Sequence, residues 1–175
     1  MSGRGKGQGV RHRHILRDNI QGLTRPVMHR MAKASGIPRV SAIVYEEVRG
    51  VIKAHLEELI RHAVTFTEHR RGKTVTAEDF DQAMKTTGGK VFPRGPQSVY
   101  FPALSFERFV REVAQDYKTD LRFTVEALIA FQLASEYYLL EVYNKSKLVM
   151  EYAGRNTLYP KDIQIARAIM RPNIA

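Results

Sequence analysis

The sequence predicts an all-α protein that contains two tandem copies of one unit, in the order short helix, long helix, short helix. Three polar residues recur at a constant offset of 83 positions, as the pairs Arg39/Arg122 (122−39), Thr74/Thr157 (157−74) and Asp79/Asp162 (162−79). Apolar residues in two long segments recur at steps of three and four, which is the spacing of one helix face, and no segment shows the alternation typical of a strand. A single offset held over this span indicates that one structural unit occurs twice.

The composition allows a folded core and excludes several kinds of site. The chain has 175 residues, of which 43% are hydrophobic, and this is enough for one or two small domains. It has no cysteine, so disulfides and thiolate metal sites are excluded. The sequence contains no signal-like apolar region near its start and no apolar run as long as a membrane span, and we expect a soluble, intracellular protein.

The chain is strongly basic, and the charge is unevenly distributed. The formal net charge is +10. Residues 1–90 carry 17 Lys and Arg against 9 Asp and Glu, a balance of +8, whereas residues 91–175 carry 11 against 9, a balance of +2. Such a balance favours nucleic acid or an anionic membrane surface as the partner, and the alternative is a soluble protein that is merely basic.

Residues 1–22 are predicted to be a disordered basic tail. Glycine alternates with polar residues near its start, and such a segment cannot bury apolar surface. A compact basic patch follows, made of Arg11, His12, Arg13 and His14. A run of this kind is usually only solvated, but on a flexible tail it can also bind phosphate or an acidic protein surface.

Residues 23–86 form the first predicted unit. Thr24 suits an N-cap and Pro26 suits the first turn of a short helix, which a glycine and a proline then end. A long helix follows at about 41–68, with its apolar residues three and four apart. After a basic loop, Thr76 suits the N-cap of a second short helix with an acidic first turn.

The second unit, residues 104–175, follows a linker at 87–103 that is rich in glycine and proline. It repeats the plan, with a short helix at 105–117, a long helix at 124–152 and a short helix that begins at Pro160. A helix of about 28 residues is a rod of roughly 40 Å, too long to bury its apolar face by itself. We therefore expect the two long helices to cross and cover each other, with the linker making this pairing intramolecular.

Several runs resemble the core histones. Similarity to histone H-four lies in residues 11–22, 45–47, 67–69 and 73–77, and similarity to histone H-three lies in residues 109–123 and 160–167. Together the resemblance covers about 11–86 and 104–171. A covalent H-four then H-three order resembles the doublet histones of giant DNA viruses.

The resemblance implies two tandem histone folds that form an intramolecular handshake heterodimer with three DNA-contacting surfaces. The implied DNA-binding residues are Arg25, Arg30, Arg39, Lys73, Thr74, Arg108, Arg111, Arg122, Arg155 and Thr157. Physical reasoning favours the same positions, because a loop that opens onto a helix N-terminus offers N–H groups to phosphate and arginine reaches a narrow minor groove. The alternative is that each loop arginine is an exposed charge or the ion-pair partner of Asp79 or Asp162.

The resemblance also implies protein partners and a location. The self-association interface with a second copy would contain Leu148, Val149, Tyr152, Asp162 and Ile165. The interface with H-two-A/H-two-B-like histone dimers or a doublet would contain His62, Phe66, His69 and Gln82. The expected location is chromatin, in the host nucleus, or in the viral factory and virion if the protein is viral, with no membrane partner.

We expect a protein that wraps and compacts double-stranded DNA without sequence specificity. An interaction module of a transcription complex, with the same fold but no wrapping, is the alternative. We expect no enzyme, because the sequence has no nucleophile–base set and no phosphate-binding glycine motif. We expect no cofactor and no metal, because His55, His62 and His69 are seven residues apart, whereas helical metal ligands are three or four apart.

Overall fold

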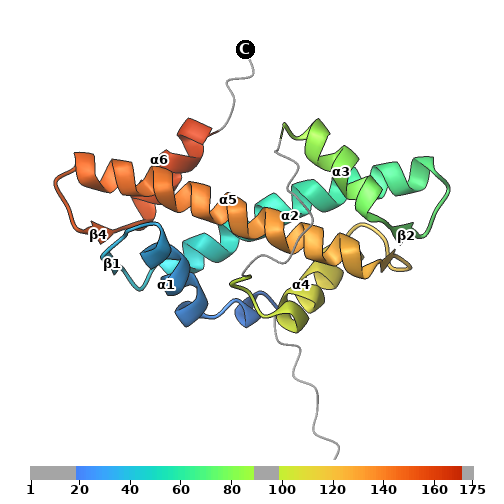
Figure 1. Cartoon of the computed structure of the whole chain (residues 1–175), viewed down its shortest axis with the longest axis horizontal. Helices are drawn as coiled ribbons and strands as arrows, with labels where there is room; N and C mark the ends of the chain where they lie inside the picture. Colours follow the sequence, from blue (N-terminus) through green and yellow to red (C-terminus); the bar gives the residue numbers. More distant parts are fainter. Residues whose placement is uncertain (1–18, 89–98, 171–175) are drawn as a thin grey trace, which may run out of the picture.

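The computed structural model describes residues 19–88 and 99–170. Within these residues, two long helices, α2 (Val44–His69) and α5 (Val125–Tyr152), cross each other, and short helices flank each of them (Figure 1). The first unit contains α1 (Arg25–Ala34) and α3 (Ala77–Thr86), and the second contains α4 (Ala103–Gln115) and α6 (Pro160–Met170). The prediction of two short–long–short helical units is thereby confirmed.

The predicted helix caps are partly realised. Thr76 and Asp79 form a capping box, in which the Asp79 N–H donates to Thr76 Oγ1 and the Thr76 N–H donates to Asp79 Oδ2 at 2.8 Å. Thr124, which the sequence predicted to be the first residue of the long helix, instead caps α5 by accepting from the Ala127 N–H at 3.2 Å. Thr24 stands at the N-cap of α1 with extended backbone, but its side chain makes no capping hydrogen bond.

Four two-residue strands correct the prediction that the chain has no strand. The strand β1 (Arg39–Val40) pairs in parallel with β4 (Thr157–Leu158), and β2 (Thr74–Val75) pairs in parallel with β3 (Arg122–Phe123). Two residues are too few to show a period in the sequence, and each pairing joins segments that are remote along the chain. Each pair joins the first loop of one unit to the second loop of the other.

The repeat places its own equivalent residues against each other where α2 and α5 cross. The rings of His55 and Tyr138, which are 83 positions apart (138−55), stack with centroids 3.9 Å apart and planes 10° apart. Leu56 and Leu139, the next equivalent pair, are fully buried. The two long helices therefore cover each other as expected, and an approximate two-fold axis passes through this crossing.

The folded part begins before the predicted first unit. Residues Asn19–Gly22, which the sequence assigned to the tail, form a short 3-10 helix, η1, and Ile20 in it is buried. The backbone N–H of Asn19 donates to Glu112 Oε2 of α4 at 3.0 Å. The predicted tail therefore ends four residues too late. The sequence does not show η1, because its contacts are with α4 of the second unit. The tail patch at 11–14 lies outside the described residues.

The end of the predicted linker also differs from the expectation. Phe101 is buried, and α4 begins at Ala103, where a continuous loop was expected. The physical reason is that Glu136 of α5 accepts hydrogen bonds from the backbone N–H groups of Tyr100 and Phe101, a contact between remote residues that the sequence does not show. Among the described residues, no helix is both long enough and apolar enough to cross a membrane.

Candidate nucleic-acid interface

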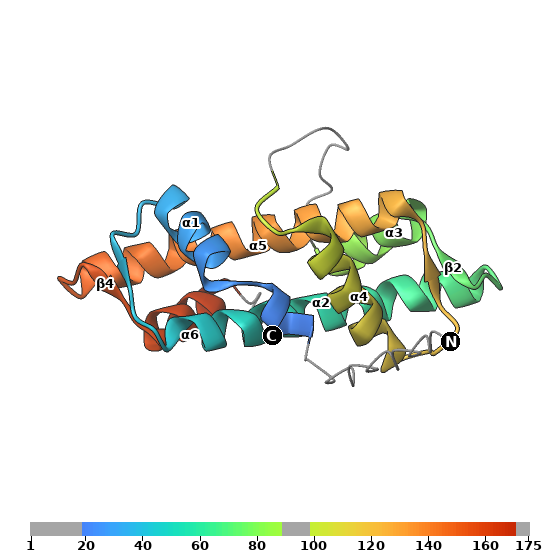
Figure 2. The same cartoon turned by 90° about the horizontal axis from the view of Figure 1, so that it is seen from below.

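One side of the molecule carries the elements on which most of the predicted DNA-binding residues lie. Figure 1 shows α1 and α4 on one side of the crossed helices, with α3 and α6 on the other and the paired strands at the two far ends. Figure 2, seen from below, shows η1, α1 and α4 lying across this side. We call this side the cationic face, and it consists of α1, α4 and the two strand pairs.

At one end of the cationic face, Arg39 lies beside Thr157. The two residues are partners in the β1–β4 pair, and the Ser41 N–H continues this pairing by donating to the Leu158 carbonyl at 3.1 Å. Arg39 is exposed. The sequence proposed both residues separately, whereas the fold brings them together from the two different units.

The other end repeats this arrangement. Arg122 lies beside Thr74 in the β2–β3 pair, and its backbone N–H donates to the Lys73 carbonyl at 2.9 Å. Arg122 is exposed. Each end of the face thus presents an arginine from the first loop of one unit and a threonine from the second loop of the other.

The middle of the cationic face carries four predicted arginines, and their side chains differ in how they are engaged. The Arg25 guanidinium lies 5.8 Å from the centroid of the Tyr45 ring. Arg30 Nη2 donates to the Tyr100 carbonyl at 3.3 Å. Arg111 forms an ion pair with Glu107, one turn earlier on α4, and Arg108 is exposed. All four remain accessible to an anion.

The two predicted second-loop cations are both engaged in ion pairs. Lys73 Nζ lies 3.1 Å from Asp120 Oδ2, and both side chains are exposed, so water screens this pair strongly. Arg155 Nη2 lies 2.6 Å from Asp162 Oδ1, and Arg155 Nη1 donates to the Thr157 carbonyl at 3.1 Å. Arg155 is thus the partner of Asp162, as the alternative interpretation allows, and its side chain remains partly exposed.

A second arginine–aspartate pair, which the sequence interpretation missed, occurs in the first unit. Arg70 Nη2 lies 2.6 Å from Asp79 Oδ2. Arg70 does not recur at the offset of 83, so the repeat gave no signal for it; the recurrence of Asp79 as Asp162 was the available clue. Burial alone raises the pKa of both carboxyls, but hydrogen bonds from the arginines and from backbone N–H groups outweigh it, and both pKa values are lowered.

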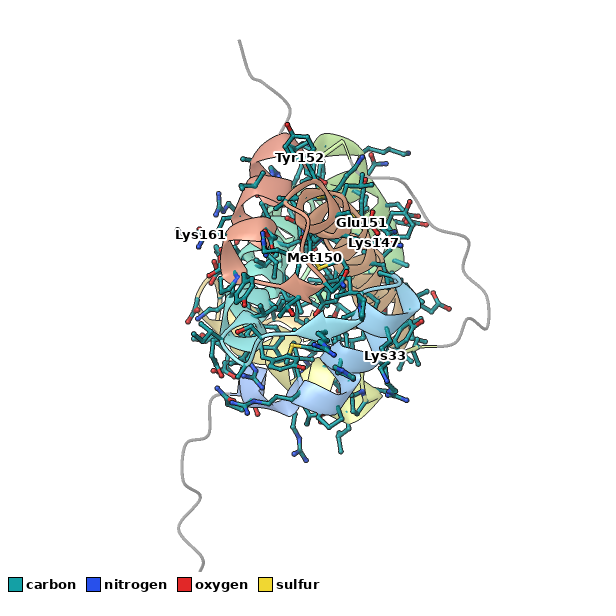
Figure 3. All side chains as sticks on the ribbon, turned by 90° about the vertical axis from the view of Figure 1, so that its left-hand side faces the viewer. Lys33, Lys147, Met150, Glu151, Tyr152 and Lys161 are labelled. Atoms are coloured by element: carbon teal, nitrogen blue, oxygen red, sulfur yellow. The ribbon has the colours of Figure 1, made fainter. Side chains whose placement is uncertain are left out.

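Of the predicted self-association residues, Leu148, Val149 and Tyr152 lie in the last two turns of α5, and Asp162 and Ile165 lie in the first two turns of α6. Leu148 is 61% exposed, Tyr152 97% and Ile165 48%, and Val149 is half-buried. Asp162 corrects the prediction, because its carboxylate is buried and engaged by Arg155 and the Tyr159 N–H within the same chain. Figure 3, which views this end, shows Tyr152 on the side of the molecule opposite Lys33 of α1.

The predicted partner-dimer residues lie on α2 and α3. His69 and Gln82 are exposed, and His62 and Phe66 are half-buried. Within the described residues, no group of three or more His, Asp or Glu side chains is arranged to hold a metal ion.

His55 lies at the crossing of α2 and α5, and its pKa is strongly lowered. Burial at the crossing disfavours its charged form, the charge of Arg167 adds to this effect, and together they lower the pKa of His55 to about 4. The imidazole is therefore neutral near pH 7, which suits its stacking on Tyr138.

Comparison with known proteins agrees with this architecture. Residues 95–169, which are 75 of 175 positions (169−95+1), match the family model of the core histone domain, which describes histones H-two-A, H-two-B, H-three and H-four. The structure is similar to the crystal structure of the histone from Methanopyrus kandleri, with a TM-score of 0.66 and 15% sequence identity. This match covers 86% of the present chain and 96% of the other, so it spans both units. At this identity the likeness establishes the fold, and the chain carries the histone fold.

Proposed function

We propose that this chain is a fused H-four/H-three histone that wraps and compacts double-stranded DNA without reading its sequence. The fold by itself does not assign this function, because the same fold also suits a module that only binds other proteins. The proposal depends on how the cations are placed. It assigns direct DNA contact to Arg39, Arg122 and the arginines of α1 and α4, and a supporting role to Arg155.

One observation carries the proposal. The strand pairs place Arg39 beside Thr157 and Arg122 beside Thr74 at opposite ends of the cationic face, with α1 and α4 between them. An anionic rod laid along this face meets an arginine and a helix N-terminus at each end and further arginines in the middle. Repeated arginine contacts of this kind bind DNA by its backbone and minor groove, without base-specific hydrogen bonds.

We further propose that two copies pair through exposed apolar residues of α6 and of the C-terminal end of α5, and that histone dimers of the H-two-A/H-two-B type dock on α2 and α3. Leu148, Tyr152 and Ile165 expose apolar surface at the first of these places. Exposed apolar patches mark protein interfaces more often than chance predicts. Such an assembly would be part of chromatin, in a nucleus or, for a viral protein, in the viral factory and virion.

Nuclease protection tests the proposal. The chain, combined with matched partner histones, should protect a defined length of DNA, and binding should weaken steeply as salt rises because counterions are released. The absence of any protected length would refute wrapping.

A double variant separates this function from the alternative, an interaction module of a transcription complex. Arg39→Ala plus Arg122→Ala should abolish most of the protection. The charge-matched control, Lys53→Ala plus Lys145→Ala, removes two exposed cations that the proposal assigns to no DNA or protein contact, and it should protect DNA as the unmodified chain does. An interaction module would protect no DNA length with or without these two arginines, whereas full protection by the loop double variant would show that Arg39 and Arg122 do not hold the DNA.

A further inference from the structure

Two polar side chains of α5 are buried one helical turn apart, beside the segment that leads into α4. Gln132 is 5% exposed and Glu136 is 4% exposed. A buried carboxylate is costly unless hydrogen bonds or a cation compensate it. The donors recorded for Glu136 among the described residues are amide groups: the backbone N–H groups of Tyr100 and Phe101 and the side chain of Gln132.

These contacts grip the backbone of the segment rather than its side chains. The Tyr100 N–H donates to both oxygens of Glu136, at 3.0 and 2.9 Å, and the Phe101 N–H donates to Oε1 at 2.8 Å. Gln132 Nε2 donates to the Phe101 carbonyl at 2.8 Å and to Glu136 Oε1 at 3.2 Å. Hydrogen bonds to an ionised acceptor are stronger than neutral ones. Glu136 and Gln132 therefore fix this non-helical backbone against α5.

The same segment is also held by its own side chain and by the first unit. The ring of Phe101 is buried and lies parallel to that of Phe106, with centroids 5.8 Å apart. Arg30 of α1 donates to the Tyr100 carbonyl from the cationic face. The backbone of residues 100 and 101 is thus hydrogen-bonded both to α5 of its own unit and to Arg30 of the first unit.

The residues that Glu136 and Gln132 contact, 100 and 101, directly precede α4. Pro102 is the N-cap residue of α4, and it provides no side-chain hydrogen bond to the first turn. The first turn of α4 therefore lacks the usual fixing contact, and its direction depends on the residues before it. Arg108 and Arg111 follow one to two turns later.

We propose that Glu136 and Gln132 form a backbone clamp that positions the start of α4, and with it Arg108, Arg111 and Arg30, in the middle of the cationic face. Neither residue touches DNA in this proposal, so both are positioning residues. The effect on DNA rests on the proposed function, whereas the effect on the segment itself does not.

Hydrogen exchange of the free protein tests the clamp directly. Glu136→Gln keeps the size of the side chain but turns one acceptor into a donor that faces the Tyr100 N–H. The amides of Tyr100 and Phe101 and the first turn of α4 should then exchange about tenfold faster, as expected for a lost hydrogen bond to a charged acceptor. Glu141→Gln, on an exposed position of the same helix, is the matched control and should leave exchange unchanged. Unchanged exchange in Glu136→Gln would overturn the clamp.

Hydroxyl-radical footprinting of bound DNA distinguishes positioning from a general loss of stability. In Glu136→Gln, protection should weaken where α1 and α4 lie on the DNA and persist at the two ends, where Arg39 and Arg122 bind. Uniform weakening along the DNA would overturn the positioning role. Gln132→Leu leaves the carboxylate in place and should give the same pattern more weakly; it replaces Glu136→Gln if that variant fails to fold. If the unmodified chain bound no DNA, the proposed function would fail, but the exchange result would still decide on the clamp.

Discussion

Asp79 and Asp162 stand at equivalent positions of the two units, and each is paired with an arginine from the loop that follows a long helix. The two arginines, however, do not stand at equivalent positions in the sequence. In the second unit Arg155 reaches Asp162 from seven residues before it, and in the first unit Arg70 reaches Asp79 from nine residues before it. Both guanidinium groups also donate to the carbonyl of the nearby strand threonine, at 3.1 and 3.0 Å. The same local structure is therefore built twice from two different sequence patterns.

Gly72 explains how the loop between α2 and α3 accommodates an arginine at position 70. The offset of 83 places Gly72 at the position equivalent to Arg155 (155−83=72). A Cβ added at Gly72 would lie 3.3 Å from Arg70 Nη1 and 3.4 Å from its Cζ, so the Arg70 side chain passes over this glycine. The intervening Arg71 adopts a φ of 56°, which is uncommon for a residue other than glycine. Both units therefore place a guanidinium against the equivalent carboxylate, although the two arginines come from different positions in the sequence.

The largest expected effect tests whether the two carboxylates are equivalent. Asp79→Ala and Asp162→Ala should each lower the free energy of unfolding by about 2–3 kcal/mol, because each carboxylate accepts hydrogen bonds from a guanidinium and from the backbone of a helix start. For a chain of this length, the thermal midpoint should fall by about 5–10 °C. Asp116→Ala, at the exposed end of α4, is the control and should leave the midpoint unchanged. A large effect at one aspartate and none at the other would break the equivalence.

The crossing provides the next test, because the repeat places a titratable histidine opposite a tyrosine. The lowered pKa of His55 means that the unfolded chain binds a proton before the folded one does, so stability is full above about pH 6.5 and falls toward pH 4. Between pH 7.5 and pH 5 the expected loss is about 2 kcal/mol. The lowered pKa values of Asp79 and Asp162 act in a separate window, below about pH 4.

Denaturant unfolding at several pH values, with two variants, assigns this loss. His55→Phe should remove most of the dependence between pH 7.5 and pH 5, whereas Tyr138→Phe should retain it. A dependence that is the same in His55→Phe and in the unmodified chain would assign the loss to other groups.

A smaller effect tests whether Arg70 can be replaced by an arginine at the position that Arg155 occupies in the second unit. Arg70→Ala should lower the thermal midpoint, and adding Gly72→Arg should restore most of it, because the guanidinium then starts from the position used in the second unit. Gly72→Ala alone should lower the free energy of unfolding by about 1 kcal/mol through crowding against Arg70, and this loss should vanish when Arg70 is already alanine.

In the second unit, Gly154→Ala should lower the free energy of unfolding by about 1 kcal/mol whether or not Arg155 is present, since its φ of 65° strains any side chain.

The smallest effect concerns the exposed pair of Lys73 and Asp120, because the offset of 83 places Asn156 and Ile37, which cannot form an ion pair, at the equivalent positions (73+83 and 120−83). Both side chains are exposed, so Asp120→Asn should leave the thermal midpoint unchanged. A clear decrease would show that this end of the molecule depends on a contact that the other end lacks.

The sequence alone determined the helical architecture and the repeat. Helical periodicity, the Thr76–Asp79 capping box and the constant offset are local properties, and each survives in the structure because hydrogen bonds and apolar faces along one segment encode it. The identity of Arg39 and Arg122 as exposed loop cations also followed from the offset.

The tertiary structure decided which remote groups meet. The four short strands pair segments of different units, and the clamp of Glu136 on residues 100 and 101 joins parts of the second unit that are 36 and 35 positions apart. The pairing of Arg70 with Asp79 is closer in sequence, but it depends on the path of the loop between α2 and α3. In the same way, the loop between α5 and α6 brings Arg155 to the buried carboxylate of Asp162. Such contacts are set by side-chain reach and burial in three dimensions, for which one sequence contains no periodic signal.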